Sequence, residues 1–197
     1  MRTERLSAFT DGVIAILITI MVLELKVPHG TDLDALSGLV PIFLVYVLSF
    51  VMLGIYWNNH HHMFALTDRI TGGILWANLH LLFWLSLMPF VTGWMGENHF
   101  APLPTALYGV VLLMSGVAYF ILEQTIIRSQ GASSKLKAAV GNDAKGKVSM
   151  LLYALAIPLA FVHQLLADAI YVTVVLTWLI PDRRIEHLFE EARETGQ

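Results

Sequence analysis

An arginine and an aspartate stand six residues apart in the stretch RLSAFTDG, residues 5–12, just before a long apolar run. Groups such as Arg5 and Asp11 are costly inside a membrane helix, and where they occur they pair with other groups or relay protons. At 100° per residue the two side chains lie about 240° apart around a helix, which argues against a direct pair between them. We therefore expect each of them to reach another helix.

Three consecutive histidines, in the stretch YWNNHHHMF at residues 56–64, could carry protons or hold a metal ion together with Asp68. Histidine titrates near neutral pH and is a common metal ligand. Adjacent helix positions are separated by 100°, so His60, His61 and His62 cannot face one ion unless the helix unwinds. We expect no resident metal, and a partly solvated cluster in which one histidine is buried as a hydrogen-bond partner.

Polar residues also interrupt a third apolar stretch, NLHLLFWLSLMP, at Asn78, His80 and Ser86. One interpretation is that they bond to another helix, as polar groups in membrane helices tend to do. The other is that they belong to a proton pathway. The residue types and spacing leave both open.

The sequence shows few of the residue combinations that catalysis requires. It has 0 cysteines, which excludes disulfides, thiolate metal sites and thiol catalysis. A nucleophile, a base and an orienting acid do not converge at one depth. We therefore expect a protein that is not an enzyme, with no cofactor and no nucleic-acid partner.

The composition is that of a membrane protein. Hydrophobic residues make up 56% of the 197 residues and charged residues 14%, against about 25% charged in soluble domains. The mean hydropathy is +0.66. Six apolar runs come close to the length of about 20 residues that a membrane-crossing helix needs. They lie near residues 6–26, 37–59, 70–94, 103–127, 147–164 and 167–181.

The expected fold is therefore all-α, a polytopic membrane protein with six transmembrane helices. The last two runs are nearly continuous, and the polar stretch HQLLAD, residues 163–168, is the expected hairpin between them. We expect residues 1–182 to form one six-helix transmembrane domain and residues 183–197 a short cytoplasmic tail. Apolar residues at helical spacing in that tail predict a short interfacial helix.

Basic residues indicate the orientation. With six crossings both termini lie on the same side of the membrane, and 11 of the 12 Lys and Arg residues fall on that side. Basic residues are enriched in cytoplasmic loops. The sequence therefore predicts a multi-pass protein of the cell membrane with cytoplasmic N- and C-termini.

The first run can be drawn as a helical wheel. Gly12, Ile16, Thr19, Ile20 and Leu23 share one stripe about 100° wide, and Asp11 lies off it. The back of the helix carries residues such as Ile14, Leu17 and Met21 and is apolar as well. Hydrophobicity therefore does not say which face meets lipid, protein or water. The glycine and the hydroxyl on the front stripe are compatible with helix packing and with lining a conduit.

Several of these features together resemble a known family. The string Arg5-x-x-x-Phe9-Thr10-Asp11 at the start of the first of six spans, and the YWNNHH end of the second, are similar to the family of the endolysosomal potassium channel transmembrane protein 175, in particular its short prokaryotic members. The family signature is Arg-x-x-x-Phe-Ser-Asp, and Thr10 keeps the hydroxyl of the serine. The resemblance covers essentially the whole chain.

The resemblance implies a modestly potassium-selective cation channel whose first helix lines the pore in an oligomer. It implies no carbonyl selectivity filter, and the sequence contains no TVGYG. Because single-repeat members are tetramers, it implies a homotetramer, with potassium ions and the lipid bilayer as partners. The family's hydrophobic constriction begins five residues after the signature aspartate, at Ile16. It would continue through Ile20 and Leu23, with Thr19 on the same stripe.

The resemblance also implies that the signature is a structural network around the first helix and not an ion filter. Its expected members are Arg5, Phe9, Thr10 and Asp11 on the first span, with Trp57, Asn58 and His60 or His61 on the second.

Two other functions stay open. A secondary transporter of a small cation or solute would need a midplane site built from paired halves, and neither paired halves nor charged midplane residues are found. The histidines near Asp11 also suggest a channel that responds to protons.

Overall fold

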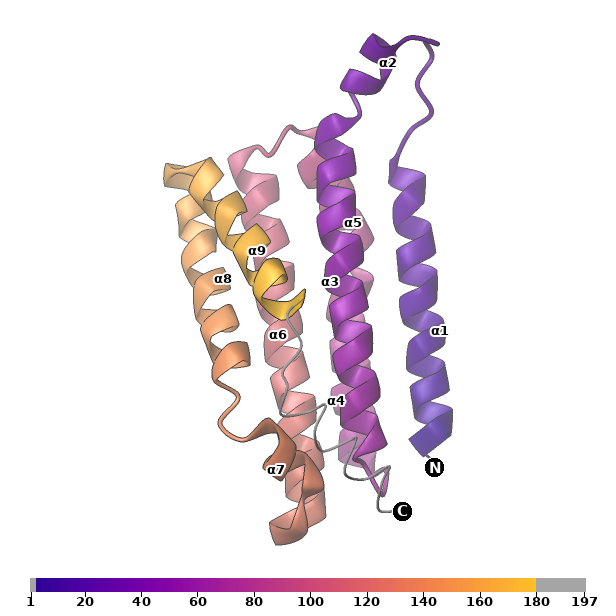
Figure 1. Ribbon diagram of the computed structural model, residues 1–197, viewed down its shortest axis with the longest axis vertical. Coiled ribbons are helices and arrows are strands. Elements are labelled where there is room, and N and C mark those ends of the chain that lie inside the picture. Colours follow the sequence, from indigo (N-terminus) through magenta and orange to yellow (C-terminus); the bar gives the residue numbers. More distant parts are fainter. Residues whose placement is uncertain (1–2, 180–197) are drawn as a thin grey trace.

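The computed structural model describes residues 3–179, which form helices and connecting loops without a strand. The longer helices are α1 (Thr3–Met21), α3 (Val40–Ala65), α4 (Gly72–Ser86), α5 (Met88–Glu97), α6 (Pro102–Gln130), α8 (Ala144–Val162) and α9 (Gln164–Leu179). They form a bundle in which α4 and α5 follow one another along one span and α9 runs obliquely to the others (Figure 1). Short helices lie in the connections: η1 (Val22–Glu24), α2 (Leu33–Ser37), η2 (Gly131–Ser133) and α7 (Lys135–Val140).

The all-helical membrane fold expected from the sequence is confirmed. Five helical segments within the described range are long and apolar enough to cross a membrane, with α4 and α5 together forming one of them. The helix α9 is apolar but has 16 residues, about 24 Å of helix against a hydrocarbon core of about 30 Å. The count of six spans therefore stays a prediction. The predicted interfacial helix of the tail lies outside the described residues.

The chain departs from continuous helix at two places, within the third predicted span and between the last two. The third span changes from α4 to α5 at Leu87, where Pro89 stands near the start of α5 and has no N–H to continue the hydrogen-bond ladder. The hairpin expected over residues 163–168 is tighter than predicted. The chain turns at His163 (φ −151°, ψ 78°), and the rest of that stretch is the first turn of α9.

Charge is distributed unevenly along the bundle. The N-terminal end of α1 and the helix α7 lie at the lower end in Figure 1, and α2 lies at the upper end. Basic residues of the described range gather in the elements of the lower end: Arg5, Arg69, Arg128, Lys135, Lys137, Lys145 and Lys147. Only Lys26 of that range lies beyond the upper end of α1.

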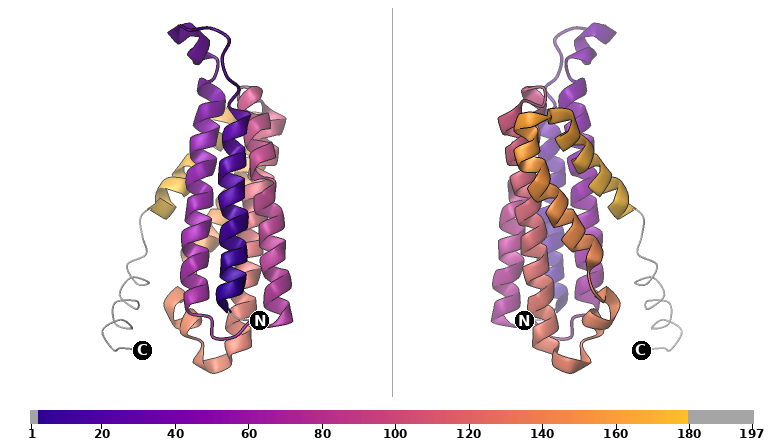
Figure 2. Two further views of the ribbon diagram at one scale, coloured as in Figure 1. Left: turned by 90° about the vertical axis from the view of Figure 1, so that its right-hand side faces the viewer. Right: turned by 90° about the vertical axis from the view of Figure 1, so that its left-hand side faces the viewer.

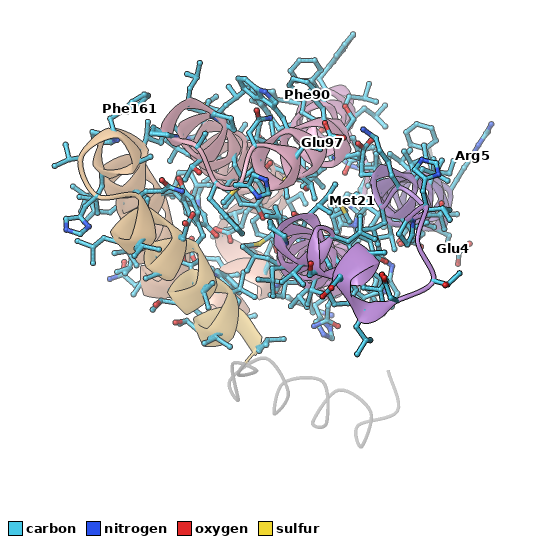
Figure 3. The ribbon with its side chains drawn as sticks, turned by 90° about the horizontal axis from the view of Figure 1, so that it is seen from above. Glu4, Arg5, Met21, Phe90, Glu97 and Phe161 are labelled. Atoms are coloured by element: carbon cyan, nitrogen blue, oxygen red, sulfur yellow. The ribbon has the colours of Figure 1, made fainter. Side chains whose placement is uncertain are left out.

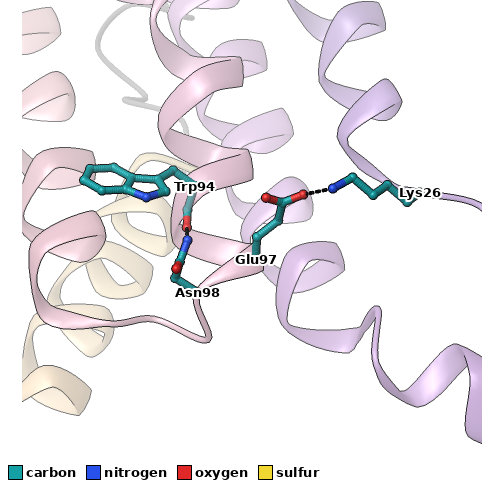
Figure 4. Close-up of polar contacts among 4 residues, drawn as sticks. All are labelled: Lys26, Trp94, Glu97 and Asn98. Atoms are coloured by element: carbon teal, nitrogen blue, oxygen red, sulfur yellow. Dashed lines mark hydrogen bonds and ion pairs between the residues drawn. The ribbon is translucent and has the colours of Figure 1, made fainter.

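Lys26 forms an ion pair with Glu97 at the end of α5 (Figure 4). The nearby carboxylate raises the pKa of Lys26 above its usual value. Next to this pair, the Asn98 side chain donates to the Trp94 carbonyl at 2.8 Å and caps the helix. Both charged side chains are well exposed, so water screens the pair and it is expected to contribute little to stability.

The core lies around α6, which packs against α4, α5, α8 and α9. Seen from above (Figure 3), Met21 points toward the interior of the bundle, whereas Arg5 and Phe90 point outward. Buried hydroxyls link three helices within the core. The Ser49 hydroxyl on α3 lies 2.7 Å from that of Thr92 on α5 and 3.0 Å from that of Tyr108 on α6. Such bonds between helices supply affinity that the hydrophobic effect does not supply in lipid.

At Gly96, α5 comes very close to α3. A Cβ atom at Gly96 would lie 2.5 Å from the Ile42 Cα, a contact that only movement of the backbone could relieve. We expect Gly96→Ala to lower the free energy of unfolding by about 1–3 kcal/mol, measured by thermal unfolding of the protein in detergent. Gly54→Ala on α3 is the matched control, because nothing lies within 4 Å of a Cβ there. Equal stability of both variants would contradict the prediction.

Candidate functional site

The helix α1 stands at the margin of the bundle. It packs against α3, α4 and α5, and Figure 2 (left) shows it in front of them, with α8 and α9 behind. Its packed face consists of residues at helical spacing: Leu6, Thr10, Ile14, Leu17 and Met21. The tertiary structure therefore selects, between two apolar faces, the one that meets the other helices.

The opposite face of α1 points away from the bundle. The exposed fraction is 56% for Ile16 and 42% for Ile20, and nothing lies within 4 Å of a Cβ built on Gly12. The Thr19 hydroxyl lies on this face and donates to its own helix, to the carbonyls of Ala15 (3.1 Å) and Ile16 (2.9 Å). Its oxygen is left free to accept. We call Gly12, Ile16, Thr19 and Ile20 the outer face of α1.

Leu23 extends this surface but not in the same helical register. The α-helix ends at Met21 and continues as the 3₁₀-helix η1, which has a different pitch. Leu23 is 74% exposed, more than Ile16 and Ile20. The following Glu24 side chain lies against Gly93 of α5, where an added Cβ would overlap the carboxylate. A glycine at position 93 thus lets the end of the first span lie close to α5.

A buried polar network joins α1 to the second and third spans. The Asn78 amide nitrogen donates to the Thr10 hydroxyl at 2.9 Å, and the Asn78 amide oxygen lies 2.8 Å from the His60 Nε2. All three residues are buried, with at most 1% of each exposed. Asn78, on α4, therefore connects α1 to α3. Its amide nitrogen makes one of the two bonds and its amide oxygen makes the other.

The direction of these bonds assigns the tautomer of His60. If the Asn78 amide nitrogen donates to Thr10, its oxygen must accept, so the proton of His60 lies on Nε2. The ring stacks on Phe64 with centroids 4.2 Å apart. The other ring nitrogen, Nδ1, is buried and has no hydrogen-bond partner within residues 3–179. His60 is thus held by one strong bond and one stacking contact.

Asp11 is fixed separately. The Trp57 indole donates to its carboxylate at 3.0 Å, and Asp11 is half-buried. His61 stands beside this tryptophan, with ring centroids 6.3 Å apart. This second contact ties α1 to α3 nearer to the solvent than the Asn78 network.

The structure does not bring all the predicted network residues together. Arg5 and Phe9 are exposed on α1, and Asn58 is exposed on α3; no hydrogen bond or ion pair joins any of them to another described residue. Of the two charged residues expected to reach another helix, Asp11 does so through Trp57, whereas the exposed Arg5 side chain bonds to no other described residue. Asn78 is the member that sequence reasoning did not assign to the network. Its signal was a lone amide inside an apolar helix.

The histidine cluster divides between interior and surface. His60 is buried while His61 is exposed, so consecutive positions face different ways, as helix geometry requires. Among the described residues, no group of three or more His, Asp or Glu side chains is placed so that it could hold a metal ion.

Comparison with known proteins relates this geometry to a family. The family model of the endosomal/lysosomal potassium channel TMEM175 matches residues 5–89. This range includes the outer face of α1 and the whole polar network. A potassium channel of Chryseobacterium sp. (strain P1-3) is 53% identical over 191 residues, which cover 97% of this chain and 100% of that protein. The endosomal/lysosomal proton channel TMEM175 of Gallus gallus is 39% identical over 80 residues, or 34% of this chain and 16% of that protein.

The fold is similar to a solved structure. The crystal structure of a lysosomal potassium-selective channel TMEM175 homolog from Chamaesiphon minutus superposes with a TM-score of 0.80 and 26% identity. The match covers 90% of this chain and 96% of that one. The likeness therefore extends over the complete bundle.

Proposed function

The chain belongs to the family of the endosomal/lysosomal potassium channel TMEM175, and from this premise we propose that it forms a cation channel with a modest preference for potassium. The observation that carries the proposal is the outer face of α1. It is free of charge, points away from its own bundle and is backed by buried polar bonds to α3 and α4. An exposed, well-anchored helix face of this kind is suited to line a conduit formed by several copies.

We propose a homotetramer in which four copies of α1 surround the conduction axis. The number four follows from the family resemblance, since this chain carries one copy of the signature. Ile16, Ile20 and Leu23 would then form successive apolar rings. Such rings offer little to replace the water shell of an ion, so they gate by dewetting and select weakly.

The polar network is proposed to act as a scaffold. Thr10 and Asp11 hold α1 against α3 and α4 through Asn78, His60 and Trp57. These groups lie on the packed side of α1, away from the proposed axis. They would therefore fix the radius of the constriction without contacting the permeating ion.

The placement in the cell is proposed on the distribution of charge. The basic end of the bundle would lie in the cytoplasm, which puts both termini there and the Lys26–Glu97 pair outside. Residues 1–182 would form the transmembrane domain and residues 183–197 a cytoplasmic tail. The cell membrane is the proposed location.

The experiment that tests the proposal is a reversal-potential measurement on purified protein in planar bilayers, first under a potassium gradient and then with potassium opposed to sodium. Single-channel currents that reverse near the potassium equilibrium potential support a potassium-preferring channel. A silent bilayer, with potassium flux in liposomes only when a second solute is supplied, would replace the channel by a secondary transporter.

Thr19 is the one polar side chain proposed to face the conduction axis between the apolar rings. Thr19→Ala should change the potassium-to-sodium permeability ratio by about two- to fivefold, because the ring loses its four oxygen acceptors. Thr173→Ala on α9 is the matched control, since that hydroxyl also donates to its own helix, at 2.7 Å, and is also exposed. An unchanged ratio in Thr19→Ala would remove this residue from the pore.

A further inference from the structure

A cavity lies on the side of the bundle away from α1. It is partly open, is lined by residues of α3, α6, α8 and α9 and by Asp143 just before α8, and has a volume of about 50 Å³. Since one water molecule needs about 10–15 Å³ on the same measure, it has room for a few waters or one small organic group. Figure 1 shows α8 and α9 on the left of the bundle, α6 and α3 between, and α1 on the right. The cavity is therefore separate from the proposed pore.

Aromatic rings from all four helices line this cavity. They are Tyr56, Tyr119, Phe120, Tyr153 and Trp178. Hydrogen bonds hold two of them in place: the Tyr119 hydroxyl donates to the Asn59 carbonyl at 3.2 Å, and the Trp178 indole donates to the Ser149 hydroxyl at 2.9 Å. The rings of Tyr56 and Tyr119 meet edge to face with centroids 6.0 Å apart. The aromatic wall is thus fixed before any ligand arrives.

One hydroxyl of this wall is unused. The Tyr56 hydroxyl makes no hydrogen bond within the described part of the chain, and it lies 3.9 Å from the place that a Cβ on Gly116 would occupy. Gly116 also lines the cavity. The missing side chain at position 116 therefore opens space in front of a free polar group.

Among the residues that the structure describes, Asp143 is the only charged one that lines the cavity. It caps α8 by accepting from the Gly146 N–H at 3.1 Å through one carboxylate oxygen, and the second oxygen has no bond to another described residue. Burial raises the pKa of Asp143, and the charge of nearby Lys147 offsets only part of this. The Lys147 ammonium itself donates elsewhere, to the Asn142 carbonyl at 2.8 Å.

A cation already rests on one ring of this wall. The Lys145 Nζ lies 4.8 Å from the centroid of the Trp178 ring, within the range of a cation–π interaction, although Lys145 does not line the cavity. Rigid aromatic rings combined with a carboxylate are the arrangement that recognises alkylammonium groups, since the rings attract the cation and contact its apolar shell.

We propose that this cavity binds a small alkylammonium ion, with the Asp143 carboxylate facing its charge and the aromatic wall facing its alkyl groups. The site is independent of the conduction axis. It adds a ligand class to the protein that the permeation of potassium does not require.

To test this proposal, tetramethylammonium chloride is titrated into purified full-length protein at constant ionic strength. Isothermal titration and thermal unfolding are the measurements. We expect saturable binding that raises the melting temperature, and no comparable effect from tert-butyl alcohol, which has a similar shape but no charge. Absence of binding, or equal binding of the neutral alcohol, would overturn the proposal.

Two variants locate the binding. Asp143→Asn should weaken it about tenfold while keeping the helix cap, because asparagine caps helices as well as aspartate does. Asp34→Asn on the exposed helix α2 is the control for charge and should leave the affinity unchanged. Gly116→Ala should also weaken binding, because its methyl group would enter the cavity. It should fold, since the tightest contact, 3.2 Å, is to the flexible Met150 side chain.

A variant in the proposed pore separates the two possible locations. Ile16→Asn should bind tetramethylammonium as tightly as the natural chain does. If Ile16→Asn loses binding while Asp143→Asn retains it, the ion binds near the outer face of α1 and the cavity proposal fails. This outcome would leave the channel proposal intact.

Discussion

Replacing Ile16 by asparagine should raise the single-channel potassium conductance on the order of tenfold. Ile16 is 56% exposed on the outer face of α1, which points away from its own bundle. In a ring of four copies, an amide would hold water where isoleucine expels it, and the barrier to ion passage would fall. A tenfold increase corresponds to a barrier lower by about 1.4 kcal/mol. A change of this size is reasonable for the substitution of one ring of side chains.

Ile121→Asn on α6 is the matched control for this prediction. Ile121 is likewise an exposed isoleucine of an apolar helix, at 40%, but α6 does not contact α1 extensively. The measurement is single-channel conductance in planar bilayers, with the amount of protein and its oligomeric state checked for each variant. An increase in Ile121→Asn of the same size, or no increase in Ile16→Asn, would remove Ile16 from the constriction.

Replacing Asn78 by leucine should lower the free energy of unfolding by about 2 kcal/mol. Two hydrogen bonds between membrane helices contribute about 0.6 kcal/mol each, and both end at this amide. The change would also leave His60 buried with neither ring nitrogen bonded, since Nδ1 already has no partner among the described residues. An unsatisfied buried group costs about 1 kcal/mol or more.

The comparison variants for Asn78 separate the network from the residue type. Asn58→Leu should change stability little, because that amide is exposed and makes no hydrogen bond within residues 3–179. Thr10→Val should cost less than Asn78→Leu, and the two changes together should cost less than their sum, because they remove one bond in common. Thermal or chemical unfolding in detergent measures all four proteins. Strict additivity would show that Thr10 and Asn78 act independently.

The elements and their ends could be predicted from the sequence to a large extent. Apolar runs of membrane length are recognisable without any tertiary information, because the thickness of the bilayer sets the length of a spanning helix. The turn at His163 and the break near Pro89 were also within reach, since a polar residue and a proline interrupt otherwise apolar runs. The end of α1 was not. It changes to a 3₁₀-helix after Met21, where Glu24 lies against Gly93 of α5, a neighbour that the sequence does not reveal.

The partners of the signature residues could be predicted only in part. The sequence indicated that Asp11 reaches the second span, and the Trp57 indole does contact it. The sequence left several polar residues of that span open as partners, because the spacing along one helix does not show which of them faces the neighbouring helix. Asn78 bridges Thr10 and His60 only because α4 brings it between them.

The sequence by itself determined that this chain is an all-helical membrane protein of one family, with its basic residues at one end and an uncharged stripe on its first span. These properties follow from length, composition and short-range spacing, which the chain carries before it folds. Only the tertiary structure decided which side of the first helix is packed, which amide completes the network, and that aromatic rings from four helices line one cavity. The orientation of a helix that is apolar on every side cannot be predicted from its own sequence. The helices that pack against it determine which side is buried.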